Sequence, residues 1–189
     1  DLARKHRPDI AAITVPFPGN LYGALRIARS FKAIRPSCRI AIGGGYVNTE
    51  LREMKDPRIF DFVDFIFFDD GERPLLSIIE HLAGKRPLEG LHRTLTRLEG
   101  VVSLIDQANP ERIAFKDIGT PSFAGLNLDS YFSLCEMPNA MHRLWSDGRW
   151  NKLQLSRGCY WHKCAFCDTC LPYIHMYEIA PATELADRI

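Results

Sequence analysis

Four of the chain's six cysteines fall within twelve residues, and this crowding constrains the chain more than any other feature of its sequence. They are Cys159, Cys164, Cys167 and Cys170. A free cysteine can serve as a small buried hydrophobe, but thiols spaced this closely in a loop cannot all point into one apolar core. The Cys-x-x-Cys spacing instead brings two thiolates onto one metal centre. The segment therefore predicts a metal or cluster site.

The residues just before the cysteines indicate where such a site lies in the fold. Apolar and polar side chains alternate from Lys152 to Ser156, as in a strand with one buried face. Gly158 then allows the backbone to turn. We therefore expect the cysteines on a loop just past the end of a strand, where parallel α/β architectures carry their chemistry.

The spacing leaves more than one kind of site open. Nothing resembles a secretory signal, and six cysteines are few for a disulfide-stapled scaffold. A Cys₄ zinc site usually has two Cys-x₂₋₄-Cys pairs joined by a longer connector, and no second pair follows here. Thiolates also hold iron–sulfur clusters, although a bacterial ferredoxin run would need a cysteine where Ile174 stands. The spacing favours a cluster and leaves zinc as the alternative.

The segment from Ser156 to Cys167 resembles the signature of radical S-adenosylmethionine (radical SAM) enzymes. It reads Ser-Arg-Gly-Cys, a gap, then Cys-Ala-Phe-Cys. The first gap has four residues where the family commonly has three. The resemblance implies that Cys159, Cys164 and Cys167 hold a [4Fe-4S] cluster whose remaining iron binds S-adenosylmethionine. It also implies that the backbone of Phe166 lies near the adenine.

Two further side chains of the loop could bind a metal in principle. By the same resemblance Cys170 is a spare thiol, with a fourth ligand as the alternative. His162 lies inside the first gap. We expect it to be a solvated loop histidine rather than a ligand.

Residues 1 to about 95 are expected to alternate between strands and helices. An apolar run at residues 10–15 is typical of a parallel strand buried on both faces. With short connections, three β-α steps predict an α/β fold with a parallel, doubly wound sheet. The expected strands are residues 10–15, 39–42 and 62–68, and the expected helices are residues 24–34, 49–55 and 74–82.

Small and polar residues follow each of these strands, at the sheet edge where open α/β sheets bind ligands. On pattern alone they are tight turns. The three strand ends occur in a set order and are followed by the cysteine loop. This arrangement resembles the later half of the cobalamin-binding domain that precedes many radical SAM barrels, a domain with a flavodoxin- or Rossmann-like fold. The resemblance implies that these turns cradle cobalamin. The residues are Gly19, Asn20, Gly43, Gly44, Gly45, Asp70, Gly71 and Glu72.

Three parts of the chain are therefore predicted. Residues 1–95 form a partial cobalamin-binding domain. Residues 96–150 form a linker with a β-hairpin, in which Val101–Ile105 pairs with Arg112–Lys116. Residues 151–189 begin a radical SAM domain with the first β-α unit of a partial TIM barrel. We expect the chain to be a piece of a longer protein, because a whole α/β barrel needs roughly 200 residues.

The composition of the chain limits the classes of binding partner that we expect. The formal net charge is +1, which gives no electrostatic case for nucleic acid or a membrane surface. No apolar run approaches the ~20 residues of a membrane span. We therefore expect a cytoplasmic enzyme. By resemblance, its partners are an electron donor such as flavodoxin or ferredoxin and a substrate that the sequence does not identify.

The resemblance implies a radical SAM enzyme that cleaves S-adenosylmethionine reductively to start radical chemistry. A cobalamin domain in this family often accompanies methyl transfer, so we expect a transferase as one form of the activity. Two alternatives stay open. In one, the four clustered cysteines close a zinc site in a non-enzymatic binding module. In the other, they hold a fully ligated cluster in a ferredoxin-like electron-transfer protein.

Overall fold

The computed structural model describes residues 2–106, 112–127, 130 and 154–187, and the chain divides into two compact units, residues 1–113 and 114–189. In the part of the chain that the structure describes, no helix is both long and apolar enough to cross a membrane. Each unit is described by itself below.

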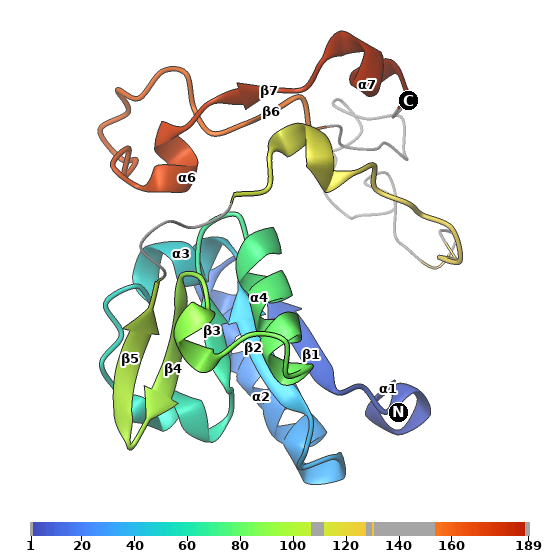
Figure 1. Ribbon diagram of the computed structural model, residues 1–189, viewed down its shortest axis with the longest axis vertical. Coiled ribbons are helices and arrows are strands. Elements are labelled where there is room, and N and C mark those ends of the chain that lie inside the picture. Colours follow the sequence, from blue (N-terminus) through green and yellow to red (C-terminus); the bar gives the residue numbers. More distant parts are fainter. Residues whose placement is uncertain (1, 107–111, 128–129, 131–153, 188–189) are drawn as a thin grey trace, which may run out of the picture. The chain divides into compact units, whose positions relative to one another are not determined.

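The first unit is built on a five-stranded sheet in the order β1-β2-β3-β4-β5 (Figure 1). β1, β2 and β3 run parallel, whereas β4 and β5 are antiparallel to their neighbours. The strands are β1 (Ile10–Thr14), β2 (Arg39–Gly43), β3 (Phe65–Phe67), β4 (Thr94–Leu98) and β5 (Val101–Ile105). The helices are α1 (Leu2–His6), α2 (Pro18–Ile34), α3 (Gly45–Glu50) and α4 (Glu72–Leu82), with short 3₁₀ turns η1 (Pro57–Asp61) and η2 (Leu88–Gly90).

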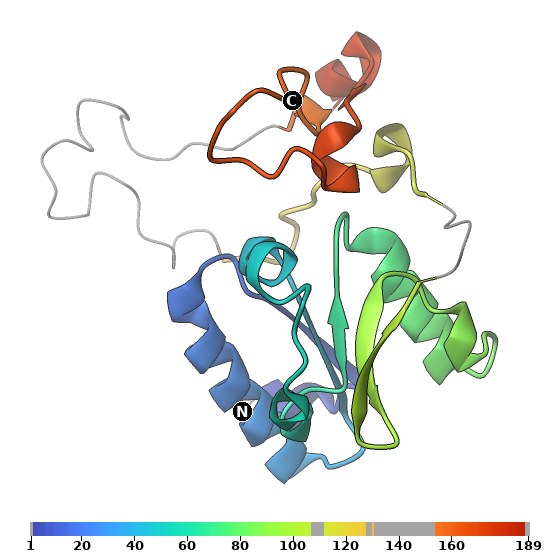
Figure 2. The ribbon, with the colours of Figure 1, turned by 90° about the vertical axis from the view of Figure 1, so that its left-hand side faces the viewer.

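Helices cover both faces of this sheet, with α2 and α4 on opposite sides (Figure 2). Successive residues of a strand point to opposite faces. Ile40 and Ile42 of β2 therefore join one buried cluster with Ala24 and Ala28 of α2. Ala41, between them, packs in a second cluster that contains Ile78 of α4. The predicted α/β, doubly wound architecture is confirmed, with an antiparallel pair of strands added at one side.

Two details of the expected β-α pattern are wrong. β1 is an edge strand of the described sheet rather than a strand buried on both faces. Ala12 and Thr14 are exposed. The expected helix at residues 49–55 instead begins at Gly45, because Gly44 starts the turn directly after β2.

The predicted linker hairpin is also wrong. β5 pairs with β4, in a register that sets Leu98 opposite Val101. Only Glu99 and Gly100 connect the two strands, and both have positive φ (49° and 85°). Such two-residue turns match the twist of the strands they join. The expected partner, residues 112–116, forms no strand, and most of the expected turn lies outside the described residues. The three predicted domain boundaries stay a prediction.

The second unit contains η3 (Phe115–Ile118), β6 (Ser156–Arg157), α6 (Pro172–His175), β7 (Glu178–Ile179) and α7 (Ala182–Asp187). β6 and β7 form an antiparallel pair, with Ser156 opposite Ile179. Behind this pair Phe115 is buried, and its N–H donates to Oε2 of Glu178 at 3.2 Å. The Arg157 guanidinium lies 5.7 Å from the centre of the Phe115 ring. These contacts anchor both strands at the base of the cysteine loop.

Candidate functional site

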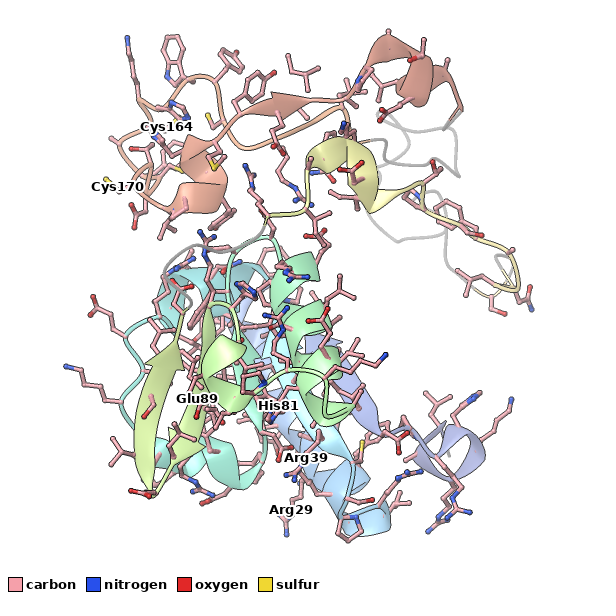
Figure 3. All side chains as sticks on the ribbon, viewed as in Figure 1. Arg29, Arg39, His81, Glu89, Cys164 and Cys170 are labelled. Atoms are coloured by element: carbon pink, nitrogen blue, oxygen red, sulfur yellow. The ribbon has the colours of Figure 1, made fainter. Side chains whose placement is uncertain are left out.

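The cysteine loop runs from the end of β6 to α6, and all four of its thiols are free. Figure 3 shows Cys164 and Cys170 on this loop. Cys159, Cys164 and Cys167 are half-buried, whereas Cys170 is exposed. In the first unit Cys38 is fully buried, and this burial raises the pKa of its thiol. The loop cysteines are thus accessible donors, while Cys38 is a packing residue.

Gly158 fixes the point at which the loop leaves β6. Its φ is +79°, and a Cβ at this position would lie 1.5 Å from the carbonyl oxygen of Met176. A side chain cannot fit there. The next residue, Cys159, donates its backbone N–H to the Ile174 carbonyl at 2.9 Å. The two ends of the loop are therefore held together by backbone contacts that only glycine permits.

Backbone hydrogen bonds also shape the turns that carry the thiols. The N–H of Trp161 lies 3.3 Å from Sγ of Cys159 and donates to it. The N–H of Cys167 donates to the Cys164 carbonyl at 3.2 Å, which closes the Cys-x-x-Cys turn. Hydrogen bonds to sulfur are among the features that tune iron–sulfur clusters. The local backbone thus suits thiolate chemistry.

His162, expected from the sequence as a solvated loop histidine, is half-buried. Its φ is +51°, a left-handed conformation that is uncommon outside glycine. Its ring stacks on His175 with centroids 4.9 Å apart and an interplanar angle of 20°. Nε2 is buried and has no hydrogen-bond partner among the described residues. The imidazole is therefore partly shielded from solvent, and the expectation that it is not a ligand stays a prediction.

The Phe166 side chain is 93% exposed. Its ring makes no close packing that would explain an aromatic residue inside the Cys-x-x-Cys turn. The backbone of Phe166 is expected to lie near the adenine of S-adenosylmethionine. This expectation stays a prediction.

The donor chemistry of the loop fits an iron–sulfur cluster, but the side chains are not gathered into a closed site. Within the described ranges, no group of three or more Cys, His, Asp or Glu side chains is placed to hold a metal ion. Three half-buried free thiols on one loop are nevertheless the kind of donor that an iron–sulfur cluster uses. Cys159, Cys164 and Cys167 are therefore the residues that could hold a cluster.

The predicted cobalamin residues lie at the carboxyl ends of β1, β2 and β3, which meet at one edge because these strands are parallel. Gly19 and Asn20 occupy the exposed first turn of α2, and a Cβ on Gly19 would meet nothing within 4 Å. Gly71 precedes α4 with φ +80°, and Glu72 is the first residue of that helix. The sheet thus brings the three predicted turns to the same edge.

Part of this pattern has a packing explanation. A Cβ on Gly43 would lie 2.4 Å from Cε2 of Phe67 on the neighbouring strand. Gly44 has φ +108°, and a Cβ there would lie 2.9 Å from the Val15 carbonyl oxygen. The first two glycines of the triplet are therefore needed for β1, β2 and β3 to approach one another. Gly45, exposed at the start of α3, is the one most open to a ligand.

Sequence reasoning missed a buried ionic network at this edge. The Asp69 side chain is 2% exposed and pairs with both Arg52 and Arg93. Asn48, also buried, bonds to the Asp69 backbone, and Arg52 lies 5.1 Å from the centre of the Phe68 ring. The partners are 17 and 24 residues from Asp69 in sequence, so no local pattern could have found them. Beside the network, the predicted residue Asp70 accepts a hydrogen bond from Nε of Arg112 at 3.1 Å.

A cavity of about 250 Å³ lies at the opposite ends of the strands. It is bordered by Arg39 at the start of β2, Phe65 at the start of β3, and His81 of α4. Figure 3 labels Arg39 and His81. Since open α/β sheets bind ligands at the carboxyl ends of their strands, this cavity is separate from the predicted cobalamin edge.

Comparison with known proteins gives one informative result. No family model and no curated protein matches the chain. A solved structure does match: the apo form of OxsB, described as a cobalamin-dependent S-adenosylmethionine radical enzyme, with a TM-score of 0.69 over 98% of this chain. The likeness is one of fold.

Sequence identity between the two chains is 21%. The present chain covers 23% of the length of OxsB, so most of that enzyme has no counterpart here. The likeness supports the α/β architecture of the chain.

Proposed function

We propose that this chain is part of a radical SAM enzyme with a cobalamin-binding domain. The observation that carries the proposal is the loop after β6, where three half-buried free thiols in Cys-x₄-Cys-x₂-Cys spacing follow a turn that only glycine can make. The fold likeness to OxsB adds support, because a fold argues for a function only together with a site.

In this proposal Cys159, Cys164 and Cys167 hold a [4Fe-4S] cluster. When bound, the cluster supplies one electron that breaks a carbon–sulfur bond of S-adenosylmethionine and so starts radical chemistry. The chain's own residues hold the loop in place. Gly158 lets the strand pass beneath Met176, the Cys159 N–H ties the loop to Ile174, and the exposed turn at Phe166 is free to accept the adenosyl group.

The proposed cobalamin site is the carboxyl edge of the first sheet. The support is that three parallel strands end there in Gly19–Asn20, Gly43–Gly45 and Asp70–Glu72. A Cβ on Gly19 would meet nothing within 4 Å, so the first turn of α2 leaves room for a ligand at this edge. We assign methyl transfer as the expected use of the cofactor, with flavodoxin or ferredoxin as the class of electron donor.

Anaerobic reconstitution with iron and sulfide tests the cluster. The wild-type chain should take up about four irons and four sulfides, and S-adenosylmethionine should change the EPR spectrum of the reduced cluster. Alanine at Cys159, Cys164 or Cys167 should abolish uptake. Cys170→Ala is the matched control, because Cys170 lies on the same loop but is exposed, and it should retain the cluster.

The same measurements separate the two alternatives. One zinc per chain and no sulfide would identify a structural zinc module and end the enzyme proposal. If Cys170→Ala loses the cluster and S-adenosylmethionine leaves the EPR spectrum unchanged, all four thiolates are ligands and the chain is an electron-transfer protein.

A further inference from the structure

The clearest unexplained group in the second unit is the Nε2 atom of His162. It is buried and lacks a hydrogen-bond partner among the described residues. Buried polar atoms are almost always hydrogen-bonded, because water no longer compensates them. A buried imidazole nitrogen without a partner therefore needs an explanation, and a bound group that faces it is one.

The backbone of His162 is also held in an uncommon state. Its φ of +51° lies in the left-handed region, which is uncommon for residues other than glycine, although histidine is among those found there more often. Stacking on His175, with centroids 4.9 Å apart, holds the ring in one orientation. The backbone conformation and the stacking contact thus both restrict the imidazole ring.

His162 lies between two of the cysteines along the chain. It is three residues after Cys159 and two before Cys164, within the first gap. The preceding N–H, on Trp161, already donates to Sγ of Cys159. His175 ends α6, whose first residue, Pro172, is two positions beyond Cys170. The stacked pair therefore joins the beginning of the cysteine loop to its end.

We propose that His162 donates a hydrogen bond from Nε2 to a sulfur atom of the cluster or of its cysteine ligands, and so tunes the cluster's reduction potential. This inference rests on the proposed function. A hydrogen bond to cluster sulfur stabilises the reduced, more negative state and raises the potential. The four-residue first gap is then long enough to carry both a thiolate ligand and this donor.

Three variants of the chain test the proposed hydrogen bond from His162 by the reduction potential of the cluster rather than by catalysis. His162→Phe keeps an aromatic ring for stacking but has no donor. His162→Gln places an amide N–H near the position of Nε2. His175→Phe keeps the stacking partner aromatic and leaves His162 unchanged, and it serves as the matched control.

Each variant is reconstituted anaerobically, its iron and sulfide are counted, and its midpoint potential is measured by EPR-monitored titration. We expect full iron content throughout. The potential should be more negative in His162→Phe, return toward the wild-type value in His162→Gln, and stay at that value in His175→Phe.

Equal potentials in wild type, His162→Phe and His162→Gln, with iron content intact, would overturn the donor role. Loss of iron in His162→Phe, with retention in His175→Phe, would also overturn it, since His162 would then be a ligand. If the wild-type chain itself takes up no cluster, the proposed function fails as well, so the two failures are distinguishable.

Discussion

The side chain of Asn48 and the backbone of Asp69 exchange two hydrogen bonds. Nδ2 of Asn48 donates to the Asp69 carbonyl oxygen at 3.3 Å, and the Asp69 N–H donates to Oδ1 of Asn48 at 2.6 Å. Asn48 lies in α3, after the glycine triplet, and Asp69 lies in the turn after β3. The pair therefore ties α3 to the turn after β3 at the predicted cobalamin edge.

Asp69→Asn should destabilise the first unit. The asparagine keeps the backbone bonds to Asn48 but removes the buried charge that Arg52 and Arg93 share. Breaking a buried ion pair costs about 3 kcal/mol, and the partly exposed arginines reduce this to about 2 kcal/mol. Urea denaturation followed by circular dichroism measures the loss. Asp9→Asn, which removes an exposed partner of Arg35, should leave the midpoint nearly unchanged. Equal midpoints for both variants would contradict the prediction.

Gly158→Ala should abolish cluster uptake, because its Cβ would collide with the Met176 carbonyl oxygen and force the loop off β6. Gly119→Ala is the matched control in the same unit. Gly119 also has positive φ (+84°), but a Cβ there would meet nothing within 4 Å. Gly119→Ala should lower the free energy of unfolding by about 1 kcal/mol through backbone strain, and its iron content should be normal. The iron content of both variants is measured after reconstitution. A wild-type iron content in Gly158→Ala would show that this turn is not required for cluster uptake.

Two glycine substitutions separate ligand binding from packing at the sheet edge. Gly19→Leu places a side chain in open space, so the melting temperature should not fall. If the edge binds cobalamin, this variant should nevertheless retain less corrinoid absorbance after purification with hydroxocobalamin.

Gly43→Ala is the counterpart that tests packing at the same edge. Its Cβ would press on the Phe67 ring, and such overpacking costs about 1–3 kcal/mol. This variant should therefore melt earlier. Unchanged corrinoid retention in a folded Gly19→Leu variant would remove α2 from the proposed cobalamin site.

Asp56 should titrate far below an ordinary aspartate. Hydrogen bonds from the Arg58 side chain and backbone lower the pKa of its carboxyl from 3.8 to about 2. Because the folded pKa is depressed, the interaction stabilises the folded state above pH 3.8 and is lost as the pH falls through about 2.

Carbon-detected NMR titration of the wild type and of Arg58→Ala checks this pKa. In Arg58→Ala the midpoint should move up toward 3.8, although the backbone bond that remains should keep it somewhat below that value. A wild-type midpoint near 3.8 would show that the pair does not persist in solution.

The sequence by itself determined the features that depend on neighbours along the chain. Continuous apolar runs that alternate with apolar residues at helical spacing predicted the order of strands and helices in the first unit. Gly158 predicted the turn ahead of the cysteines. These are local properties, set by backbone sterics and by the side-chain period of each element. The carboxyl-edge position of the predicted cobalamin residues followed from the parallel order of the strands.

Only the tertiary structure decided which distant segments meet. It paired β5 with β4 through Glu99 and Gly100, against the hairpin predicted from sequence. It brought Arg52 and Arg93 to Asp69, and it stacked the ring of His162 on that of His175. The physical reason is that a contact across many residues is selected by the burial of the whole unit, and short-range spacing carries no record of it.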